Sequence, residues 1–293
     1  MFQINGPVVA AVDLDDRSHE ILGQANNFAR FYNVELSVCH VLPEIFAVRP
    51  LFPQLHLGDA LKLAELEAAV RSALLERIQK ETGRGPTQVV IAVEQGTAHA
   101  GILRFAESIH AGAIVVGGKA DSQGLPMLGR AAELVVRYAH CPVLVARASP
   151  LGMVLAATDF SDPSMPAVEA GDAEAGRRKT DLTIIHAVDL SPLMLPEVGG
   201  IYPDGLLEWS NQLTSIYQKK LDECVCDFAA KGGGLLRVGP AAPVILHEAS
   251  ILPAQLLVIG THGRTGLERL ALGNVAEAVV RRAPCSVLVV RLA

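Results

Sequence analysis

Residues Val258 to Val290 read VIGTHGRTGLERLALGNVAEAVVRRAPCSVLVV, and this stretch decides the fold. An apolar run ends at Gly260, a loop follows, a helical pattern opens after Gly273, and a second apolar run closes the stretch. Strand, loop, helix and strand in this order are typical of a parallel α/β sheet, in which ligands bind at the carboxyl ends of the strands. The stretch therefore predicts both a sheet and the edge where a ligand would lie.

The chain contains this pattern twice. LGRAAELVVRYAHCPVLVAR (Leu128 to Arg147) is similar to LGNVAEAVVRRAPCSVLVVR (Leu272 to Arg291), and three further segments recur in the same order at a nearly constant offset. Ordered matches of this kind indicate a duplication. We therefore expect two α/β domains, residues 1–148 and 149–293, joined near residues 148–152, each with five parallel strands alternating with helices.

Short β-branched runs mark the expected strands, and two long helices are expected between them. The predicted strands are Val8–Val12, Leu36–Val41, Val89–Val93, Ile114–Val116 and Val143–Ala146 in the first copy, and Val154–Ala157, Leu182–Val188, Leu235–Val238, Leu256–Ile259 and Val287–Val290 in the second. The predicted long helices are Asp59–Glu81, with Leu63, Leu66, Val70, Leu74 and Ile78 as one apolar stripe, and Leu206–Ala230. The stretches Pro43–Gly58 and Leu190–Gly205 are expected to be irregular.

Composition excludes several classes of protein. Of 293 residues, 50% are hydrophobic and 19% charged, which excludes disorder. The net charge of -6 without a basic cluster argues against nucleic-acid binding. No signal-peptide pattern and no apolar stretch of roughly 20 residues is present, so we expect a cytoplasmic protein with no membrane association. The five cysteines and nine histidines show no ligand spacing, so no metal site is predicted, and His40 and His186, at equivalent strand ends, are expected to share a structural role.

Three glycines in the second copy point to an anion site. Gly260 and Gly263 allow a ligand to approach the main chain closely. Gly273 opens a helix, and a helix N-terminus offers unpaired N–H groups and a partial positive charge. The amides of Asn274, Val275 and Ala276 are therefore expected to bind phosphate.

The motif Gly-x-x-Gly, nine residues, Gly, together with GTHGRTG, APCSVLVV and the earlier ATDFSD, resembles the nucleotide motif of the universal stress protein family over nearly the whole chain. The resemblance implies doubly wound, Rossmann-like five-stranded sheets of strand order 3-2-1-4-5. It also implies an internal pseudo-dimer in which Val143–Ala146 pairs with Val287–Val290. The implied ligand is ATP, ADP or AMP, with Mg²⁺ accompanying a triphosphate. The implied role is a stress-response regulator or sensor with an unknown protein partner, and a homodimer of whole chains is left open.

The resemblance also assigns site residues in the second copy. Ala157, Thr158 and Asp159 would lie beside the adenine and ribose, and the backbone of Ala187 and Val188 would read the adenine edge. Thr261, His262 and Arg264 fall in the phosphate loop. Where the family has Ser or Thr after the last glycine, this chain has Asn274. We therefore expect an altered nucleotide preference, or weaker binding of the outer phosphates.

The first copy departs from the motif at the same place. Gly117, Gly118 and Gly129 remain, but the position matching Gly263 is not a glycine, and Arg130 replaces the small polar residue. The loop is also one residue shorter. A modified nucleotide site and a copy kept for structure are both open, and the sequence favours the second.

No catalytic residues are predicted. The Gly-x-x-x-x-Gly-Lys-Ser/Thr phosphate loop and the Gly-x-Ser-x-Gly elbow are absent, and nothing supplies an evident general base for a γ-phosphate. Slow ATP hydrolysis is the most that we expect. Two alternatives stay open: a scaffold that binds no nucleotide, and an adenylating enzyme of related fold, whose Ser-Gly-Gly-x-Asp-Ser is here replaced by ATDFSD.

Overall fold

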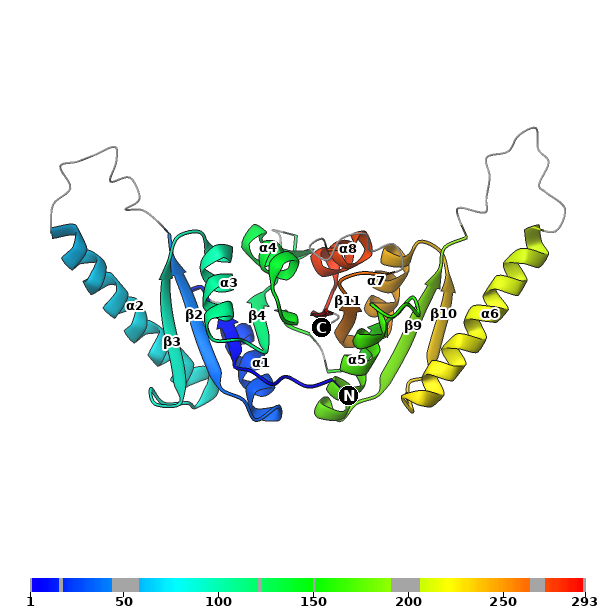
Figure 1. Cartoon of the computed structure of the whole chain (residues 1–293), viewed down its shortest axis with the longest axis horizontal. Helices are drawn as coiled ribbons and strands as arrows, with labels where there is room; N and C mark the ends of the chain where they lie inside the picture. The colour runs from blue at the N-terminus through cyan, green and yellow to red at the C-terminus, as the bar shows by residue number, and fades with distance from the viewer. Residues whose placement is uncertain are drawn as a thin grey trace, which may run out of the picture. The chain divides into compact units, whose positions relative to one another are not determined.

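The computed structural model describes residues 2–15, 18–43, 58–120, 123–149, 151–190, 206–263 and 272–291, with the backbone alone for 58–63 and 206–207. Most of the two stretches predicted to be irregular lies outside these ranges. Within them, each repeat folds into a sheet of five parallel strands with helices on both faces (Figure 1).

The first repeat builds its sheet from strands 1, 2, 3, 4 and 7 of the chain. The strands are β1 (Val8–Ala11), β2 (Leu36–Leu42), β3 (Val89–Gln95), β4 (Ala113–Gly117) and β7 (Val143–Ala146). The helices are α1 (Ser18–Phe31), α2 (Gly58–Thr82), α3 (Ala98–Ser108) and α4 (Arg130–Tyr138). The strands lie in the order β3-β2-β1-β4-β7. Helices α1 and α2 contact each other, as do α3 and α4, so each pair covers one face of the sheet.

The second repeat follows the same plan. Its strands are β8 (Met153–Ala157), β9 (Leu182–Val188), β10 (Gly234–Val238), β11 (Ala254–Gly260) and β12 (Ser286–Val290). Its helices are α5 (Met165–Arg178), α6 (Leu206–Asp227), α7 (Ala241–Ile251) and α8 (Asn274–Arg282). The strands lie in the order β10-β9-β8-β11-β12, so the predicted order 3-2-1-4-5 is confirmed within both repeats.

The first three strands of the second repeat are added toward one edge of the sheet, and the last two toward the other, so the strand order reverses between β8 and β11. In the first repeat it reverses between β1 and β4. The paired strands of each five-stranded sheet are parallel; for example, Val258 of β11 pairs with Ala156 of β8 and with Leu288 of β12. The central strands are buried on both faces, which explains their nearly continuous apolar sequences. In such a sheet the crevice at the reversal is the place where ligands bind.

A short hairpin interrupts the first repeat. Strands β5 (Lys119–Ala120) and β6 (Pro126–Met127) form a separate two-stranded sheet between β4 and α4. The chain packs as two compact units, and Ala120–Met127 belongs to the unit that contains Ala148–Ala293. Within that unit, β6 lies against α8. The duplicated sequence therefore does not divide into two independent packing units at its midpoint.

Two details of the long helices differ from the prediction. Leu66 was expected in the apolar stripe of α2, but it is 42% exposed, whereas Val70, Leu74 and Ile78 are buried. The buried face of α2 is therefore narrower at its N-terminal end. Helix α6 ends at Asp227, three residues before the predicted end, and Ala229 then takes the left-handed backbone conformation with φ of 46°.

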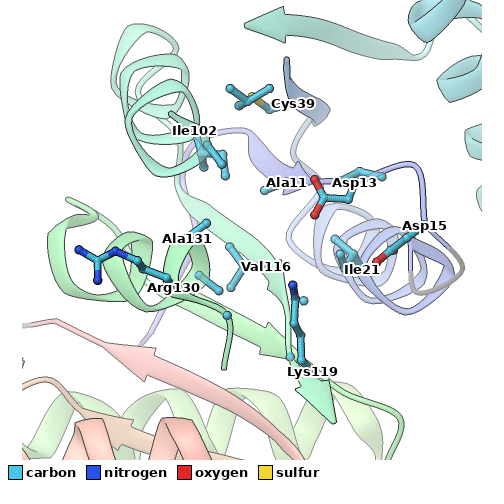
Figure 2. A pocket seen from close by; sticks show the side chains of 17 residues that line it. Ala11, Asp13, Asp15, Ile21, Cys39, Ile102, Val116, Lys119, Arg130 and Ala131 are labelled. Carbon is cyan, nitrogen blue, oxygen red and sulfur yellow. The ribbon is translucent and has the colours of Figure 1, made fainter. Parts of the chain in front are cut away.

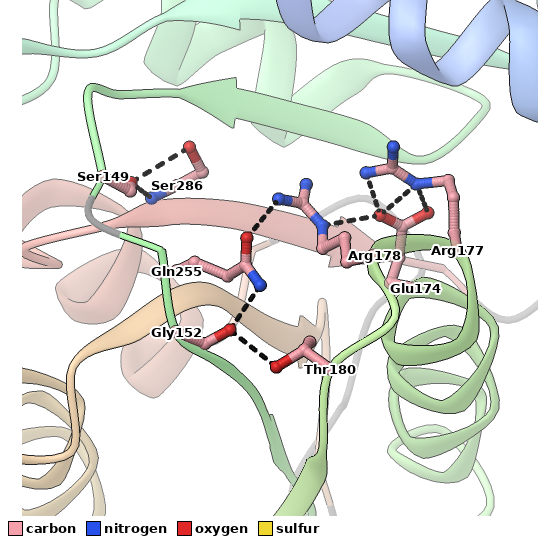
Figure 3. Close-up of polar contacts among 8 residues, drawn as sticks. All are labelled: Ser149, Gly152, Glu174, Arg177, Arg178, Thr180, Gln255 and Ser286. Carbon is pink, nitrogen blue, oxygen red and sulfur yellow. Dashed lines mark hydrogen bonds and ion pairs between the residues drawn. The ribbon is translucent and has the colours of Figure 1, made fainter.

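An ion-pair cluster at the end of α5 supports the amino ends of the second sheet (Figure 3). The fully buried Glu174 accepts hydrogen bonds from Arg177 Nε at 2.9 Å and from Arg178 Nε at 3.2 Å. Arg178 also donates to Gln255 at 3.3 Å, and Gln255 in turn donates to the carbonyl oxygen of Gly152. Burial, followed by the nearby Arg177 charge, lowers the pKa of Arg178, and Glu174 opposes that shift. The cluster thus joins α5 and β11 to the segment that enters the second repeat.

Candidate functional site

The carboxyl ends of β8 and β11 bring the predicted base end and phosphate end of the site together. Thr158 and Asp159 follow β8, and the amide of Thr158 extends the ladder to the carbonyl oxygen of Ile185 at 3.1 Å. Gly260 ends β11, and the amide of Thr261 donates to Val290 at 3.0 Å. Ala157 and Thr261 are buried, so the two strand ends form a packed floor.

The turn after β8 fixes the carboxylate of Asp159. Its Oδ1 atom accepts hydrogen bonds from the amide of Ser161 at 3.0 Å and from the Ser161 hydroxyl at 2.5 Å. The hydroxyl of Thr158 lies 2.9 Å from that of Ser164 and accepts from the amide of Phe160, also at 2.9 Å. Phe160 takes φ of 60°, which is unusual for a residue with a large side chain. These short polar side chains explain why ATDFSD forms a tight turn.

Asp159 and Gly263 lie in direct contact. A Cβ atom at Gly263 would collide with Oδ2 of Asp159, so the absence of a side chain there lets the main chain pass beside the carboxylate. The sequence assigned Gly263 to phosphate alone. The structure gives it a second reason to be glycine, since residues about a hundred positions apart meet at this point.

The N-terminus of α8 closes the other side of the site. The amide of Gly273 donates to Thr261 at 2.8 Å, and its carbonyl oxygen accepts from Glu277 at 2.9 Å. No side chain among the described residues caps this helix, and Gly273 has the extended conformation of an N-cap. The amides of Asn274, Val275 and Ala276 precede the first intrahelical donor, the amide of Glu277, so they have no partner within the helix. The predicted phosphate-binding amides are thus placed at a helix start bonded to the loop after β11.

Of the two charged or titratable residues predicted in the phosphate loop, the structure describes His262 but not Arg264. The Nδ1 atom of His262 lies 3.0 Å from the Thr261 hydroxyl, and its Nε2 atom is buried without a hydrogen-bond partner among the described residues. Arg264 lies outside the described residues.

An aromatic group that the sequence did not reveal packs beside the base end. The ring of His186 lies with its centroid 4.7 Å from that of Phe160 and 4.6 Å from that of Tyr217 in α6. His186 Nδ1 donates to the carbonyl oxygen of Thr158 at 2.8 Å; a carbonyl only accepts, so Nδ1 carries the proton. Phe160 falls inside ATDFSD, so its place in the turn was a readable signal; nothing in the sequence marks Tyr217.

The shared role expected for the two strand-end histidines is confirmed. His40 Nδ1 lies 2.7 Å from the carbonyl oxygen of Val12, as His186 does from that of Thr158. Each ring therefore joins the end of the second strand of its repeat to the end of the first. The two remaining predicted residues, Ala187 and Val188, end β9, and the Val188 carbonyl accepts from the amide of Gly239 at 2.9 Å. A carbonyl oxygen has two lone pairs, so this bond leaves Val188 able to accept another.

The first repeat has a cavity at the corresponding place. It measures about 130 Å³ and is lined by strand ends β1, β2 and β4 and by the start of α4 (Figure 2). Gly117 and Gly129, which the sequence matched to glycines of the second-copy site, line it together with Asp13 and Val41.

The described residues offer neither a membrane-spanning helix nor a group of metal ligands. None of the described helices combines the length and the apolar character that crossing a bilayer requires. The described side chains also form no group of three His, Cys, Asp or Glu residues suited to a metal ion.

The model of the universal stress protein family matches residues 5–147 and 152–291. Universal stress protein Rv1996 of Mycobacterium tuberculosis is 26% identical over 313 residues, which cover 99% of this chain and 96% of the relative. Universal stress protein MJ0531 of Methanocaldococcus jannaschii is 33% identical over 138 residues, covering 46% of this chain and 78% of the relative.

Solved structures agree on the fold. A universal stress protein from Archaeoglobus fulgidus matches with a TM-score of 0.70 at 20% identity, and the match covers 99% of both chains. A protein of the same description from Pseudomonas aeruginosa matches with a TM-score of 0.67 at 20% identity, covering 97% of this chain and 92% of the other.

Proposed function

This chain belongs to the universal stress protein family, and from that premise we propose that its second repeat, residues 149–293, binds an adenine nucleotide whose occupancy regulates a protein partner. The observation that carries the proposal is the contact between Asp159 and Gly263 at the sheet's reversal point, next to the uncapped start of α8. A fixed carboxylate and free helix amides are the two kinds of group that a nucleotide needs at its opposite ends.

Each residue has a distinct role in this proposal. Asp159 accepts a ribose hydroxyl or the exocyclic amine, because Ser161 already holds its other oxygen in place. Ala187 and Val188 face the adenine edge with backbone groups, beside the floor made by Ala157 and Thr158.

The phosphates are bound by the loop after β11 and the start of α8. Gly260, Thr261, His262 and Gly263 form the loop side together with Arg264, whose guanidinium supplies a charge-assisted contact. The amides of Asn274, Val275 and Ala276 bind from the helix side. Mg²⁺, where present, is held by the phosphates and water rather than by a protein ligand group.

The decisive first experiment is mass spectrometry of small molecules released on denaturing the purified protein, followed by titration calorimetry with ATP, ADP and AMP. We expect an adenylate to bind once per second repeat. At a ligand concentration 100 times its Kd, the free energy of unfolding should rise by roughly 2.7 kcal/mol. The absence of both heat and thermal shift at millimolar adenylate would leave the nucleotide-free scaffold as the function.

Asn274 sets the nucleotide preference in this proposal. We expect Asn274→Ser to tighten ATP binding relative to AMP by up to about tenfold, because a hydroxyl close to the helix start donates to an outer phosphate. Asn211→Ser, an exposed asparagine on α6, is the matched control and should change neither affinity. An unchanged ATP-to-AMP ratio in Asn274→Ser would remove Asn274 from the phosphate site.

The proposal describes a sensor rather than a catalyst. Hydrolysis is expected to be slow at most, because the sequence supplies no evident general base for a γ-phosphate. The proposal includes a cytoplasmic location, where the protein would sense the adenylate pool. Whether whole chains form a homodimer is to be measured by size-exclusion chromatography.

A further inference from the structure

The first-repeat cavity has charged groups at two ends and an apolar wall between them. Asp13 directs its carboxylate into the cavity, and Lys119, the first residue of β5, extends toward it (Figure 2). Ala11, Ile102 and Val116 contribute apolar surface between these ends. No ion pair joins Asp13 to Lys119 or Arg130 in the part of the chain that the structure describes, so the charges remain separate.

The cationic end is concentrated at the start of α4. A Cβ atom at the N-cap residue Gly129 would lie 3.2 Å from Cε and 3.5 Å from Nζ of Lys119, so the ammonium lies beside the helix N-terminus. Arg130, the first residue of the helix, also lines the cavity, but its guanidinium points away from Lys119 and Asp13 (Figure 2). A cation beside the positive end of a helix dipole destabilises that helix end, and a bound anion relieves the repulsion. The arrangement therefore favours a bound phosphate group.

The cavity is too small for an adenine nucleotide. Its volume of about 130 Å³ compares with roughly 300–1,000 Å³ for sites that enclose larger ligands. The loop that would surround outer phosphates is also different. Ala120 stands where the second repeat has Gly263.

A buried side chain packs against the main chain next to the cavity. A Cβ atom at Gly118 would lie 2.7 Å from Cγ and from Nε of Arg147, so the Arg147 side chain covers the main chain at the position matching Thr261. The inner wall includes the thiol of Cys39, whose pKa is raised by burial to about 12, so this wall carries no charge.

We propose that the first repeat binds a small organic phosphate, a phosphoryl group on a short hydroxylated carbon chain, with Lys119 and the α4 amides on the phosphate and Asp13 on the hydroxyl. This site is separate from the nucleotide site of the second repeat. The substitutions that replaced the family pattern thus changed the ligand class rather than removing the site.

The test is calorimetric titration of the full chain with glycerol 3-phosphate, inorganic phosphate and AMP. We expect one glycerol 3-phosphate per chain, with an affinity at least about tenfold above that for inorganic phosphate, because only the organic ligand reaches Asp13. Lys119→Gln should weaken both phosphates by about tenfold or more. Asp13→Asn should weaken glycerol 3-phosphate while leaving inorganic phosphate unchanged.

The control variant is Asp159→Asn, which alters the second repeat only and should leave glycerol 3-phosphate binding unchanged. Equal affinities for glycerol 3-phosphate and inorganic phosphate would reduce the site to a generic anion site and overturn the proposal. Lys119-dependent binding of AMP that exceeds that of glycerol 3-phosphate would overturn it in favour of a nucleotide site. Unchanged glycerol 3-phosphate binding in Lys119→Gln or in Asp13→Asn would likewise refute that residue's role, and these outcomes do not depend on whether the second repeat binds adenylate.

Discussion

At Gly263 the main chain passes directly against a carboxylate, and this contact links the two halves of the candidate site. The motif spacing predicted that a glycine was needed here, but not that Asp159 was the neighbour. Sequence spacing reports which backbone positions must lack a side chain; it does not report which distant residue fills the space. The same holds for Phe160 and Tyr217, whose contact with His186 depends on how α6 packs.

We expect Gly263→Ala to lower the free energy of unfolding by about 1–3 kcal/mol and to weaken nucleotide binding, because the new methyl group collides with Asp159. Chemical denaturation measures the first effect and calorimetry the second. Gly176→Ala is the control: in α5 an added Cβ meets nothing within 4 Å, so stability should hold or rise.

The double variant Gly263→Ala with Asp159→Ala separates a clash from a general backbone effect. Removing the carboxylate should restore much of the stability lost in Gly263→Ala. Strictly additive losses in this cycle would mean that the two residues do not interact.

The cysteines differ in the ionisation of their thiols. Burial, followed by the charge of Glu94, raises the pKa of Cys39 to about 12, and burial raises that of Cys224 to about 11. The reactive species is the thiolate, so at pH 10 only about 1% of Cys39 is reactive. With native protein and a small alkylating reagent we expect the exposed Cys226 to be modified first, as read by peptide mass spectrometry. Modification of Cys39 at the rate of Cys226 would contradict the assignment, even though Cys39 lines a cavity.

Apolar periodicity predicted the strands of the two five-stranded sheets and the long helices, but not the two-residue strands β5 and β6. The strands β5 and β6 have two residues each, too few to show any alternation, so the sequence of their region indicates only a loop. The stripe of α2 was correct at Val70, Leu74 and Ile78 and wrong at Leu66, because periodicity shows which face is apolar and not how far the sheet extends beneath it.

The ion pairs of Glu174 at the end of α5 are expected to stabilise the fold strongly. Removing the carboxylate in Glu174→Ala leaves Arg177 and Arg178 in a largely buried setting without their acceptor. We expect a loss of about 3–5 kcal/mol in the free energy of unfolding, measured by urea titration. Glu223→Ala, which breaks an exposed contact to Lys219 at 3.9 Å on α6, should cost no more than about 1 kcal/mol. Comparable losses in both variants would show that burial does not strengthen the cluster.

For the whole molecule, the duplication and the fold of each repeat were predictable from sequence, because four ordered segment matches and alternating strands and helices leave few other topologies. The pairing of Val143–Ala146 with Val287–Val290 stays a prediction. The boundary between packing units was not predictable, since Ala120–Met127 lies in the first copy by sequence and in the second unit by contacts.

This division has a measurable effect on fragments. A fragment of residues 149–293 lacks Ala120–Met127, so we expect a lower melting temperature and a tendency to associate, as seen by calorimetry and size-exclusion chromatography. Proteolytic cleavage of the full chain between residues 148 and 152 is the control: it leaves the hairpin present, and the nicked protein should stay in one piece. A fragment as stable and monomeric as the nicked chain would show that the hairpin adds nothing.

The hairpin also constrains how such a gene can change. Because eight residues encoded in the first half pack with the second, swapping either half for that of a distant relative would separate β6 from the α8 it matches. Chimeric proteins joined at the linker should therefore fold poorly unless the hairpin travels with the downstream half, so the two copies, once duplicated, are bound to diverge together.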